Sequence, residues 1–392
     1  MPETHTSSRP ASVDPLELPS LLRPSIVAAI AESEIRGDIP ATLHAELRDA
    51  GAFRLLTPRE FGGSETPLTD VLRIYESFGR IDASVGLLVW NANYGFMGAL
   101  LSESGAAQIW GDGAEPTLAN SGMPGAAVPV DGGYRLSGHW KIVSGIHAAD
   151  WFIAVGVVTE NGQPRITQAG APDIRLCAVR RDQLKVDDTW NVSGMRGTGS
   201  NDVLVEDAFI PTDLVTPSLD TPARIDRKLY RGFFPALVFP GCTAVVIGVA
   251  QSAIDEMVKL ASGKKAFAGG TIAEAARTQY TLAKSETALH AARLLLLSAA
   301  ESLQTTAERR ETVTLEQRAL LRAAMTHAAQ VSRQALVAMY ELASSSALYR
   351  GNPIERYFRD GMAALQHANQ STQFLEAAGR VRLGLDPGLP LF

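Results

Sequence analysis

Cysteine is scarce in this sequence: Cys177 and Cys242 are the only two among 392 residues. They lie far apart and form no Cys-x-x-Cys pair, so the sequence offers neither a disulfide framework nor the usual ligand spacing of a zinc site. Two reduced, buried thiols in a cytoplasmic protein are the simplest interpretation. We therefore expect no metal site.

Positively charged residues are also few: the sequence has 36 Lys and Arg residues and 42 Asp and Glu residues. The formal net charge is -6 and the isoelectric point is about 5.7, which leaves no basic face to neutralise the phosphates of a nucleic acid. With 46% hydrophobic and 20% charged residues, the composition is that of an ordinary globular protein. A chain of this length can bury the cores of two or three domains, and small or apolar molecules are the expected substrates.

Targeting segments are missing as well. Residues 1–20 are rich in Pro, Ser and Thr and lack the apolar stretch of a signal peptide, so we expect a mobile tail. The eighteen uncharged residues from Phe233 to Ala250 reach the length of a membrane span. Pro235 and Pro240 break the first half of this run, however, and the remainder is too short to cross a bilayer. We expect a helix buried on all sides, inside the protein or at a subunit interface, and no membrane partner.

A third glycine is missing from the one segment that has the appearance of a dinucleotide-binding loop. Gly197-Thr-Gly199 leads into the strand-like run Val203–Glu206, whereas that motif needs a helix whose N-terminus meets the pyrophosphate. We interpret the segment as a turn. No nicotinamide-binding unit is visible elsewhere in the chain.

Helical patterns fill the first part of the chain, residues 21–115. Within it, Leu68–Phe78 and Ala83–Leu101 carry apolar residues at helical spacing. The next part, residues 116–225, is rich in β-branched and aromatic residues bounded by Gly, Asp and Asn, which predicts a β-domain. Gly132-Gly133 separates two of its strands and is typical of a hairpin turn.

Long helices make up the last part, residues 226–392. One of them carries leucines at seven-residue intervals: Leu282, Leu289, Leu296 and Leu303. Such a seam lets two helices pack closely in a bundle. Leu315–Leu348 and Ile354–Leu383 continue the helical pattern. The sequence thus predicts an α+β multidomain protein with helices, a β-domain and a helical bundle in that order.

Four segments are similar, in this order, to motifs of the acyl-CoA dehydrogenase fold: Glu60–Gly63, Leu136–Gly145, Gly194–Val203 and Lys264–Arg293. The resemblance extends from about residue 25 to residue 385. It implies an N-terminal helical domain, a central β-barrel-like domain and a C-terminal four-helix bundle. It also implies a flavin cofactor.

The closing segment departs from the dehydrogenases at one residue. In that family an Arg-Asp pair is followed about eight or nine residues later by Tyr-Glu, and the Glu is the common catalytic base. Here Arg359-Asp360 leads to His367-Ala368, so the carboxylate is missing and an imidazole stands beside its place. The segment therefore resembles the flavin monooxygenases of this fold, which include phenol-type hydroxylases, dibenzothiophene monooxygenase and amino-sugar N-oxygenases.

This resemblance implies a two-component flavin-dependent monooxygenase. A separate reductase would deliver reduced FMN or FAD, because the chain has no nicotinamide-binding unit of its own, and O2 would be the co-substrate. A C4a-hydroperoxyflavin, shielded from water, would pass its distal oxygen to an aromatic, polycyclic or amine-containing small molecule. The family also implies a homotetramer in which a neighbouring bundle completes each flavin site.

Candidate site residues follow from the same resemblance. His367 would manage the proton during oxygen transfer, and Ser144 would form a hydrogen bond near N5 of the flavin. Further flavin contacts fall on seven positions: Asn120, Ser121, Gly145, Trp190, Lys264, Arg277 and Gln279. The substrate pocket is expected at a polar interruption of an apolar helix, formed by Trp90, Asn91, Asn93 and Tyr94.

Simpler roles compete with these assignments. Ser144 could cap a turn, Trp190 could be a core residue, and Arg277 could form a surface salt bridge. His147 is a second candidate for the catalytic histidine. Two other functions stay open: an acyl-CoA dehydrogenase whose base has moved to Glu376, and a flavin-binding scaffold without activity. The sequence specifies neither the substrate, nor FMN against FAD, nor carbon against nitrogen as the hydroxylated atom.

Overall fold

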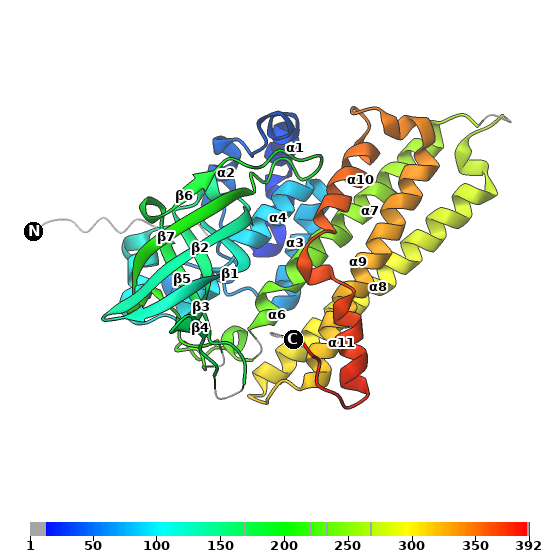
Figure 1. Cartoon of the computed structure of the whole chain (residues 1–392). Helices are drawn as coiled ribbons and strands as arrows, with labels where there is room; N and C mark the ends of the chain where they lie inside the picture. Colours follow the sequence, from blue (N-terminus) through cyan, green and yellow to red (C-terminus); the bar gives the residue numbers. More distant parts are fainter. Residues whose placement is uncertain (1–12, 168–169, 220, 233, 267–268, 390–391) are drawn as a thin grey trace, which may run out of the picture.

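The protein consists of a helical N-terminal part, a curved β-sheet and a C-terminal helical bundle (Figure 1). The structure is a computed structural model that describes residues 13–167, 170–219, 221–232, 234–266, 269–389 and 392. The N-terminal helices lie between the sheet and the bundle and pack against both. The three parts follow one another along the chain in the predicted order.

Five α-helices form the N-terminal part among the described residues: α1 (Leu18–Arg36), α2 (Ala41–Asp49), α3 (Leu68–Ile81), α4 (Ala83–Ala92) and α5 (Glu103–Trp110). Asp82 separates α3 from α4, because its carboxylate accepts a hydrogen bond of 3.0 Å from the backbone N–H of Val85 and so caps α4. The helix predicted at Leu68–Phe78 is confirmed. Residues 18–20 of the predicted mobile tail are helical, and residues 1–12 lie outside the described residues.

The helix predicted over Ala83–Leu101 is wrong beyond Ala92. α4 ends there, and a separate 3-10 turn follows at Gly95–Ala99. Asn93 causes the break, because a side-chain amide that bonds backbone groups competes with the helical pattern. It bonds three of them at 2.7–2.8 Å: the carbonyls of Ala52 and Val89 and the N–H of Leu55.

Seven strands are found among the described residues: β1 (Leu118–Val130), β2 (Gly133–Val143), β3 (Trp151–Glu160), β4 (Gln163–Pro164), β5 (Ile174–Arg180), β6 (Lys185–Asp187) and β7 (Asn201–Pro211). They form one sheet in the order β4-β3-β1-β2-β7-β6, with β5 also paired to β3. β1 and β3 are parallel, and the other pairs are antiparallel. A bridge between Cys177 in β5 and Val215 after β7 brings the two edges together, which gives the sheet the expected barrel-like curvature.

Six helices make up the described C-terminal part: α6 (Pro235–Val238), α7 (Pro240–Gly263), α8 (Ala276–Glu308), α9 (Leu315–Ala343), α10 (Pro353–Ala364) and α11 (Gln373–Arg382). Helices α7, α8, α9 and α10 are the four helices of the predicted bundle. In α8 the predicted leucine seam faces the core, with Leu289, Leu296 and Leu303 buried and Leu282 half-buried. α11 packs on α9.

One prediction about the bundle is wrong. Ile354–Leu383 is not a single helix, because the chain leaves α10 after Ala364 and enters α11 at Gln373. The link contains a 3-10 turn at Ala368–Gln370, and the side chain of His367 caps this turn. His367 therefore lies in a link between two helices and not on a helix.

The long apolar run of the sequence forms α6 and α7. By length and hydropathy Pro235–Gly263 could cross a membrane, but 89% of its most apolar window, which has a mean hydropathy of 1.8, is buried in the fold. Pro240 stands in the first turn of α7, where a proline does not break a helix. The apolar run is therefore the buried helix that the sequence predicts. The helix is longer than predicted, because Pro240 begins α7 and does not interrupt it.

Candidate active site

Strands β1 and β2 separate at one end of their hairpin. Their pairing covers Ala126–Val130 and Gly133–Ser137 and then stops. Beyond that point β1 pairs with β3 and β2 pairs with β7, and each strand contains a bulge, at Ser121–Pro124 and at Trp140–Val143. Bulges redirect side chains and often lie next to active sites. The result is an opening in the sheet along which β1 and β2 share no ladder hydrogen bonds.

Two apolar side chains stand in the bulges at this opening. Met123 is 45% exposed and Ile142 is 61% exposed. The backbone φ of Ile142 is +58°, a strained conformation for a β-branched residue and one that is found most often at functional sites. The hydroxyl of Ser121 donates a hydrogen bond of 3.2 Å to the backbone oxygen of Lys141, from one strand to the other. The opening thus combines exposed apolar surface with nearby polar groups, as ligand sites do.

The last turn of α4 holds the two strands at this opening. The Asn120 amide in β1 donates to the backbone oxygen of Asn91 at 2.5 Å and to its side-chain oxygen at 2.9 Å. The Asn91 amide donates to the backbone oxygen of Ser144, directly after β2, at 3.0 Å. All three residues are buried. Because a buried polar group without a partner costs about 1–3 kcal/mol, this network fixes the spacing of β1 and β2.

Ser144 and Gly145 follow directly after β2. The Ser144 hydroxyl lies 2.8 Å from that of Ser200, which in turn lies 2.6 Å from that of Thr198. Gly145 has a φ of +72°, and its N–H donates to the backbone oxygen of Thr198 at 2.9 Å. The Ser144 hydroxyl therefore belongs to a buried chain of hydroxyls that joins β2 to the segment before β7. Its contact with flavin N5 stays a prediction.

The segment before β7 connects the β-domain to α10. The carboxylate of Asp360 accepts a hydrogen bond of 2.8 Å from the backbone N–H of Met195. A Cβ atom on Gly194 would lie 2.4 Å from the carbonyl oxygen of Arg359, so this contact requires glycine. Burial raises the pKa of Asp360 to about 7. These contacts hold α10 in one position, directly before the link that carries His367.

Two ion pairs hold α10 against the N-terminal helices. Arg356 lies 2.5 Å from Asp82, and Arg359 lies 2.7 Å from Glu34. Both pairs are largely shielded from solvent, where the loss of one partner leaves an uncompensated charge and costs about 3–5 kcal/mol. The position of α10 is therefore fixed from two sides.

His367 lies in the link after α10 with its imidazole against the indole of Trp90. The two rings meet edge to face, with centroids 5.2 Å apart. The indole N–H of Trp90 donates to the backbone oxygen of Val238 at 2.7 Å, which fixes the ring. On the imidazole, Nδ1 accepts a hydrogen bond of 3.2 Å from the backbone N–H of Asn369 and lies 3.8 Å from the sulfur of Cys242. Burial lowers the pKa of His367 to about 4, so the ring is neutral near pH 7.

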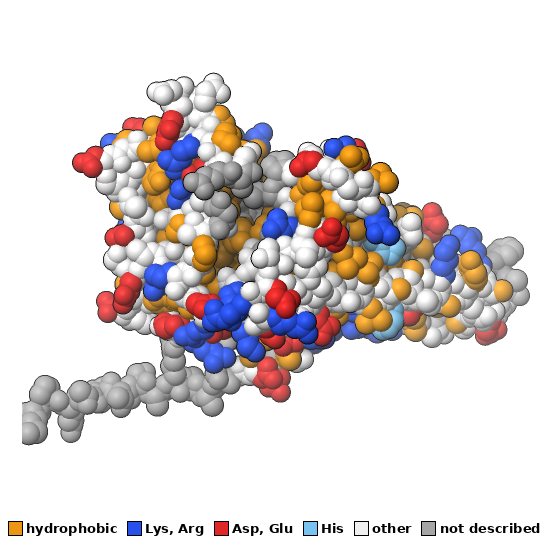
Figure 2. Space-filling view, turned by 90° about the horizontal axis from the view of Figure 1, so that it is seen from below, with side chains coloured by type: hydrophobic (Ala, Val, Ile, Leu, Met, Phe, Trp, Pro, Cys, Tyr) orange, Lys and Arg blue, Asp and Glu red, His pale blue; other side chains and the backbone are white. Residues whose placement is uncertain are grey.

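Trp90 and Asn91 place His367 and the opening in the sheet within one site. Trp90 contacts the imidazole, and Asn91, the next residue of α4, bonds Asn120 and Ser144 at the ends of the two strands. Figure 2 shows a hollow between the sheet and the bundle with hydrophobic side chains in its walls. Through these two neighbouring residues of α4, a neutral imidazole and an indole are linked to the opening in the sheet, between the domains, where ligand sites commonly occur.

Several predicted site residues come together here. Around the opening and against His367 are Asn120, Ser121, Ser144, Gly145, Trp90 and Asn91. The prediction that the amides of Asn91 and Asn93 line a substrate pocket does not fit, because both are buried and bonded within the fold, Asn93 to backbone groups and Asn91 to Ser144 and Asn120. Tyr94 is buried against Phe96, with ring centroids 5.2 Å apart.

Other predicted residues lie apart from this site. The indole N–H of Trp190 donates to the backbone oxygens of Met195 and Arg196, both at 3.2 Å, which makes it an anchor of the segment before β7. The ammonium group of Lys264 donates to the backbone oxygen of Ala343, at the end of α9, at 2.8 Å. It also donates to the hydroxyl of Ser346, in the turn that follows α9, at 2.9 Å.

Arg277 and Gln279 are exposed at the start of α8. Figure 1 shows this end of the bundle far from the sheet. One protomer therefore does not bring them to the opening, and a flavin contact from either residue requires a neighbouring protomer.

The alternative catalytic residues also lie elsewhere. His147 bonds Asp188 at 2.8 Å on an exposed surface. Glu376 is exposed in the first turn of α11, on a different helix from the one that precedes His367. A catalytic base needs contact with bound substrate in a site that excludes water, so an exposed Glu376 is a poor replacement for the missing carboxylate.

Two residues of the site escaped sequence reasoning. Cys242 contacts His367 although 125 positions separate them, and no local pattern marks such a contact. Ile142 stands in a bulge whose strain arises from the pairing of β2 with β7. Both features come from tertiary structure, which spacing along the chain does not encode.

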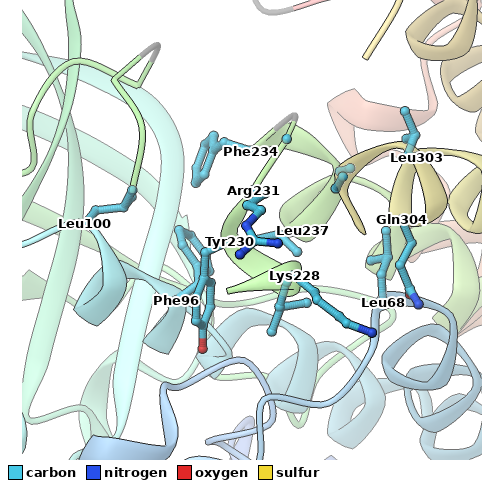
Figure 3. A pocket seen from close by; sticks show the side chains of 14 residues that line it. Leu68, Phe96, Leu100, Lys228, Tyr230, Arg231, Phe234, Leu237, Leu303 and Gln304 are labelled. Atoms are coloured by element: carbon cyan, nitrogen blue, oxygen red, sulfur yellow. The ribbon is translucent and has the colours of Figure 1, made fainter. Parts of the chain in front are cut away.

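A cavity of about 50 Å³ lies between α6 and α8. Figure 3 shows Phe96, Tyr230 and Phe234 on one side of it and Leu303 and Gln304 on the other. None of the residues around His367 lines this cavity. Small-molecule sites commonly enclose roughly 300–1,000 Å³, so the cavity is too small for an aromatic substrate in this conformation.

Two family models match the chain. Residues 20–109 match the N-terminal domain of acyl-CoA dehydrogenases, and residues 241–372 match the C-terminal domain. The solved structure of 3-HSA hydroxylase from Rhodococcus sp. RHA1 superposes with a TM-score of 0.90 at 26% identity, covering 97% of this chain and 100% of that one.

Relatives with assigned names are similar over most of the chain. Indole-3-acetate monooxygenase from Pseudomonas putida is 30% identical over 345 residues, which are 86% of this chain and 85% of that protein. The oxygenase subunit HsaA of a flavin-dependent monooxygenase from Rhodococcus jostii is 29% identical over 362 residues, which are 88% of this chain and 92% of the subunit.

Proposed function

Since this chain belongs to the flavin-dependent monooxygenases of the acyl-CoA dehydrogenase fold, we propose that it hydroxylates a ring carbon of an electron-rich aromatic small molecule. The fold and the family predicted from the sequence are thereby confirmed. An aromatic substrate is supported by the relative that is named for indole-3-acetate. The observation that carries the proposal is the pair Trp90 and Asn91, which joins a neutral His367 to the opening between β1 and β2.

The opening fits the ring system of a flavin, which has an apolar side and a polar edge of nitrogen and oxygen atoms. Asn120 and Ser121 on β1, with Ser144 and Gly145 after β2, would hold the polar edge. The exposed Ile142 would cover part of the apolar side. Reduced FMN or FAD, when bound, supplies the electrons with which one atom of O2 enters the substrate while the other becomes water.

His367 and Trp90 would form the wall opposite the sheet. No described residue bonds Nε2 of His367, which leaves this nitrogen for a hydrogen bond to the substrate or to the reacting oxygen. Trp90 is 7% exposed and is fixed by its bond to Val238, so it keeps water from this side of the site. Exclusion of water matters because solvent diverts the activated oxygen to hydrogen peroxide.

A separate reductase in the cytoplasm would supply the reduced flavin. The one glycine-rich segment that has the appearance of a dinucleotide loop is a turn, in which Gly199 has a φ of +52° and the chain continues into β7. Without a helix N-terminus after the glycines, this segment lacks the usual site for a pyrophosphate. The name of the relative from Rhodococcus jostii, an oxygenase subunit, supports a system of separate components.

A homotetramer would complete the flavin site. α8 carries exposed apolar side chains, with Tyr280 68% and Leu294 52% exposed, which favours contact with another bundle. Arg277 and Gln279 lie near Tyr280 at the start of the same helix, where they would reach the flavin of a neighbouring protomer. A guanidinium suits this place because it binds phosphate through two parallel hydrogen bonds.

The proposal is tested by supplying reduced FMN or FAD and O2 together with an indole, an arylamine or a phenol. We expect a hydroxylated product from at least one compound and less hydrogen peroxide when that compound is present. A parallel assay offers a series of acyl-CoA thioesters and an electron-accepting dye. Dye reduction by a thioester, with every aromatic compound left unchanged, would contradict the proposal.

A further inference from the structure

Nδ1 of His367 is a hydrogen-bond acceptor in this structure. The backbone N–H of Asn369 donates to it at 3.2 Å, as the first N–H groups of a helix donate to a capping side chain. A backbone N–H is a donor and never an acceptor, so this bond exists while Nδ1 keeps its lone pair. The proton of the neutral ring then lies on Nε2.

The thiol of Cys242 is the second group beside Nδ1. Its sulfur lies 3.8 Å from Nδ1 and 3.3 Å from the backbone oxygen of Phe239. Burial raises the pKa of the thiol to about 11, so the sulfur carries no negative charge that would stabilise an imidazolium. A neutral thiol donates to one of these two acceptors. A bond to Nδ1 supports the same form of the imidazole as the Asn369 backbone does, and a bond to Phe239 leaves that form to Asn369 alone.

Burial of the imidazole opposes its protonation. On α9 the guanidinium of Arg322 lies between the rings of Phe239 and Phe374, 3.8 and 4.2 Å from their centroids, and interacts electrostatically with Cys242 on α7. On α4 the imidazole meets the uncharged indole of Trp90. No carboxylate among the described residues bonds to the imidazole, so no ion pair offsets the burial that disfavours an imidazolium.

We propose that Asn369 and Cys242 hold His367 as a neutral hydrogen-bond donor, with its proton on Nε2, and that His367 removes no proton during the reaction. The proposal rests on the proposed function and narrows its substrate class. A phenol becomes most reactive at carbon as a phenolate, which requires a base in the site. The substrate is therefore an aromatic compound that is activated without losing a proton, such as an indole or an arylamine. Asn369 and Cys242 are positioning residues.

Nitrogen NMR of the protein labelled with ¹⁵N-histidine tests the form of the imidazole without flavin or substrate. The chain has seven histidines, and His367→Gln identifies the signal by its loss. We expect the pattern of a neutral ring protonated on Nε2, unchanged between about pH 5 and about pH 9. A signal that titrates near the ordinary pKa of 6.5, or that shows the proton on Nδ1, would overturn the proposal.

Substitution of the two buried cysteines tests the positioning role of the thiol. Cys242→Ala removes the group beside Nδ1, and Cys177→Ala in β5 is the matched control. We expect Cys242→Ala to shift the His367 signal and to raise the hydrogen peroxide released per reduced flavin roughly threefold, whereas Cys177→Ala changes neither. Cys242→Ser should restore both values, because a hydroxyl also donates. An unchanged His367 signal in Cys242→Ala would remove Cys242 from the proposal.

Hydroxylation rates at a series of pH values separate this proposal from the proposed function. The hydroxylation rate of an indole or an arylamine should show no titration of a group with a pKa near 6.5. A phenol should react more slowly than these compounds, except at high pH, where the phenol is already ionised. A phenol that reacts fastest, at a rate that falls as His367 takes up a proton, would contradict the inference. If no aromatic compound reacts while the NMR pattern is as expected, the proposed function fails and the form of the imidazole stands.

Discussion

Nδ1 of His367 lies 3.2 Å from the backbone nitrogen of Asn369. Because of this contact, the protonation state of the imidazole depends on the path of the link between α10 and α11. The link begins where α10 ends. α10 is held against the β-domain by the bond from Met195 to its Asp360 and by the close approach of Gly194 to its Arg359. The chemistry of His367 therefore depends on how the bundle is docked onto the sheet. Variants at the docking contact should change catalysis although they touch no substrate.

The stability of the fold should depend on pH through two buried groups with opposite signs. Folding lowers the pKa of His367 from 6.5 to about 4, so the unfolded chain binds more protons there and stability rises as the pH increases from about 4 to 6.5. Folding raises the pKa of Asp360 from 3.8 to about 7, so the folded protein binds more protons and stability falls between 3.8 and about 7.

Single variants should separate these two contributions. In urea unfolding at a series of pH values, His367→Gln should leave a stability that falls as the pH rises towards 7. Asp360→Asn should leave a stability that rises from about pH 4 to about pH 6.5. If both variants keep the pH dependence of the unchanged protein, the two pKa shifts are not present.

Asn91→Ala should weaken flavin binding, because it removes the side-chain amide that bonds the Asn120 side chain and the backbone oxygen of Ser144. The bond from Asn120 to the backbone oxygen of Asn91 remains. We expect a loss of stability of about 1–3 kcal/mol and an affinity for FMN or FAD lowered about tenfold. Asn93→Ala is the matched control, since that amide bonds only backbone groups of the N-terminal part. It should destabilise the fold and leave the flavin affinity unchanged. Fluorescence titration measures the affinity, and equal affinities in the two variants would speak against the role given to Asn91.

Gly194→Ala should disturb the docking of α10, because its new methyl group meets the carbonyl oxygen of Arg359 at 2.4 Å. We expect a loss of about 1–3 kcal/mol of stability and more hydrogen peroxide per hydroxylated product. Gly379→Ala in α11 is the control, since nothing lies within 4 Å of its added methyl group. It should leave the product ratio unchanged and stabilise the helix by up to about 1 kcal/mol. A product ratio that changes equally in both variants would show that docking at Gly194 has no catalytic effect.

Arg277→Ala should lower the affinity for flavin without lowering stability, because Arg277 is exposed in the protomer. Lys264→Ala should instead lower the stability without lowering the affinity for flavin, because Lys264 holds the end of α9 through two hydrogen bonds of 2.8 and 2.9 Å. Sedimentation of the protein with bound flavin measures its oligomeric state, and thermal unfolding measures its stability. If Arg277→Ala binds flavin as tightly as the unchanged protein, the neighbouring protomer does not supply this contact.

The fold was predictable because its signals are local and repeated. The leucine seam of α8 and the glycine turn between β1 and β2 each follow from spacing over a few residues. Four motifs in the right order then indicated the family. Helix ends were harder to predict: Asn93 and His367 end helices through side-chain bonds to backbone groups, which compete with an apolar pattern that continues past them.

The site was predictable in part. The family motifs predicted His367, Ser144 and Asn120, and the polar interruption of an apolar helix predicted Trp90. The structure brings these residues to the candidate site, and their roles toward flavin and substrate stay predictions. The state of the imidazole was not predictable, because it depends on Cys242 from a distant helix and on the path of a link without a repeating pattern.

A single turnover under ¹⁸O2 tests the central claim most directly. The protein is loaded with reduced FMN or FAD and an indole or an arylamine, and the product is analysed by mass spectrometry. We predict that one atom of ¹⁸O enters the aromatic ring and that His367→Ala releases most of the oxygen as labelled hydrogen peroxide. Product oxygen that comes from water, or labelled hydrogen peroxide as the sole product with every aromatic compound, would contradict the account.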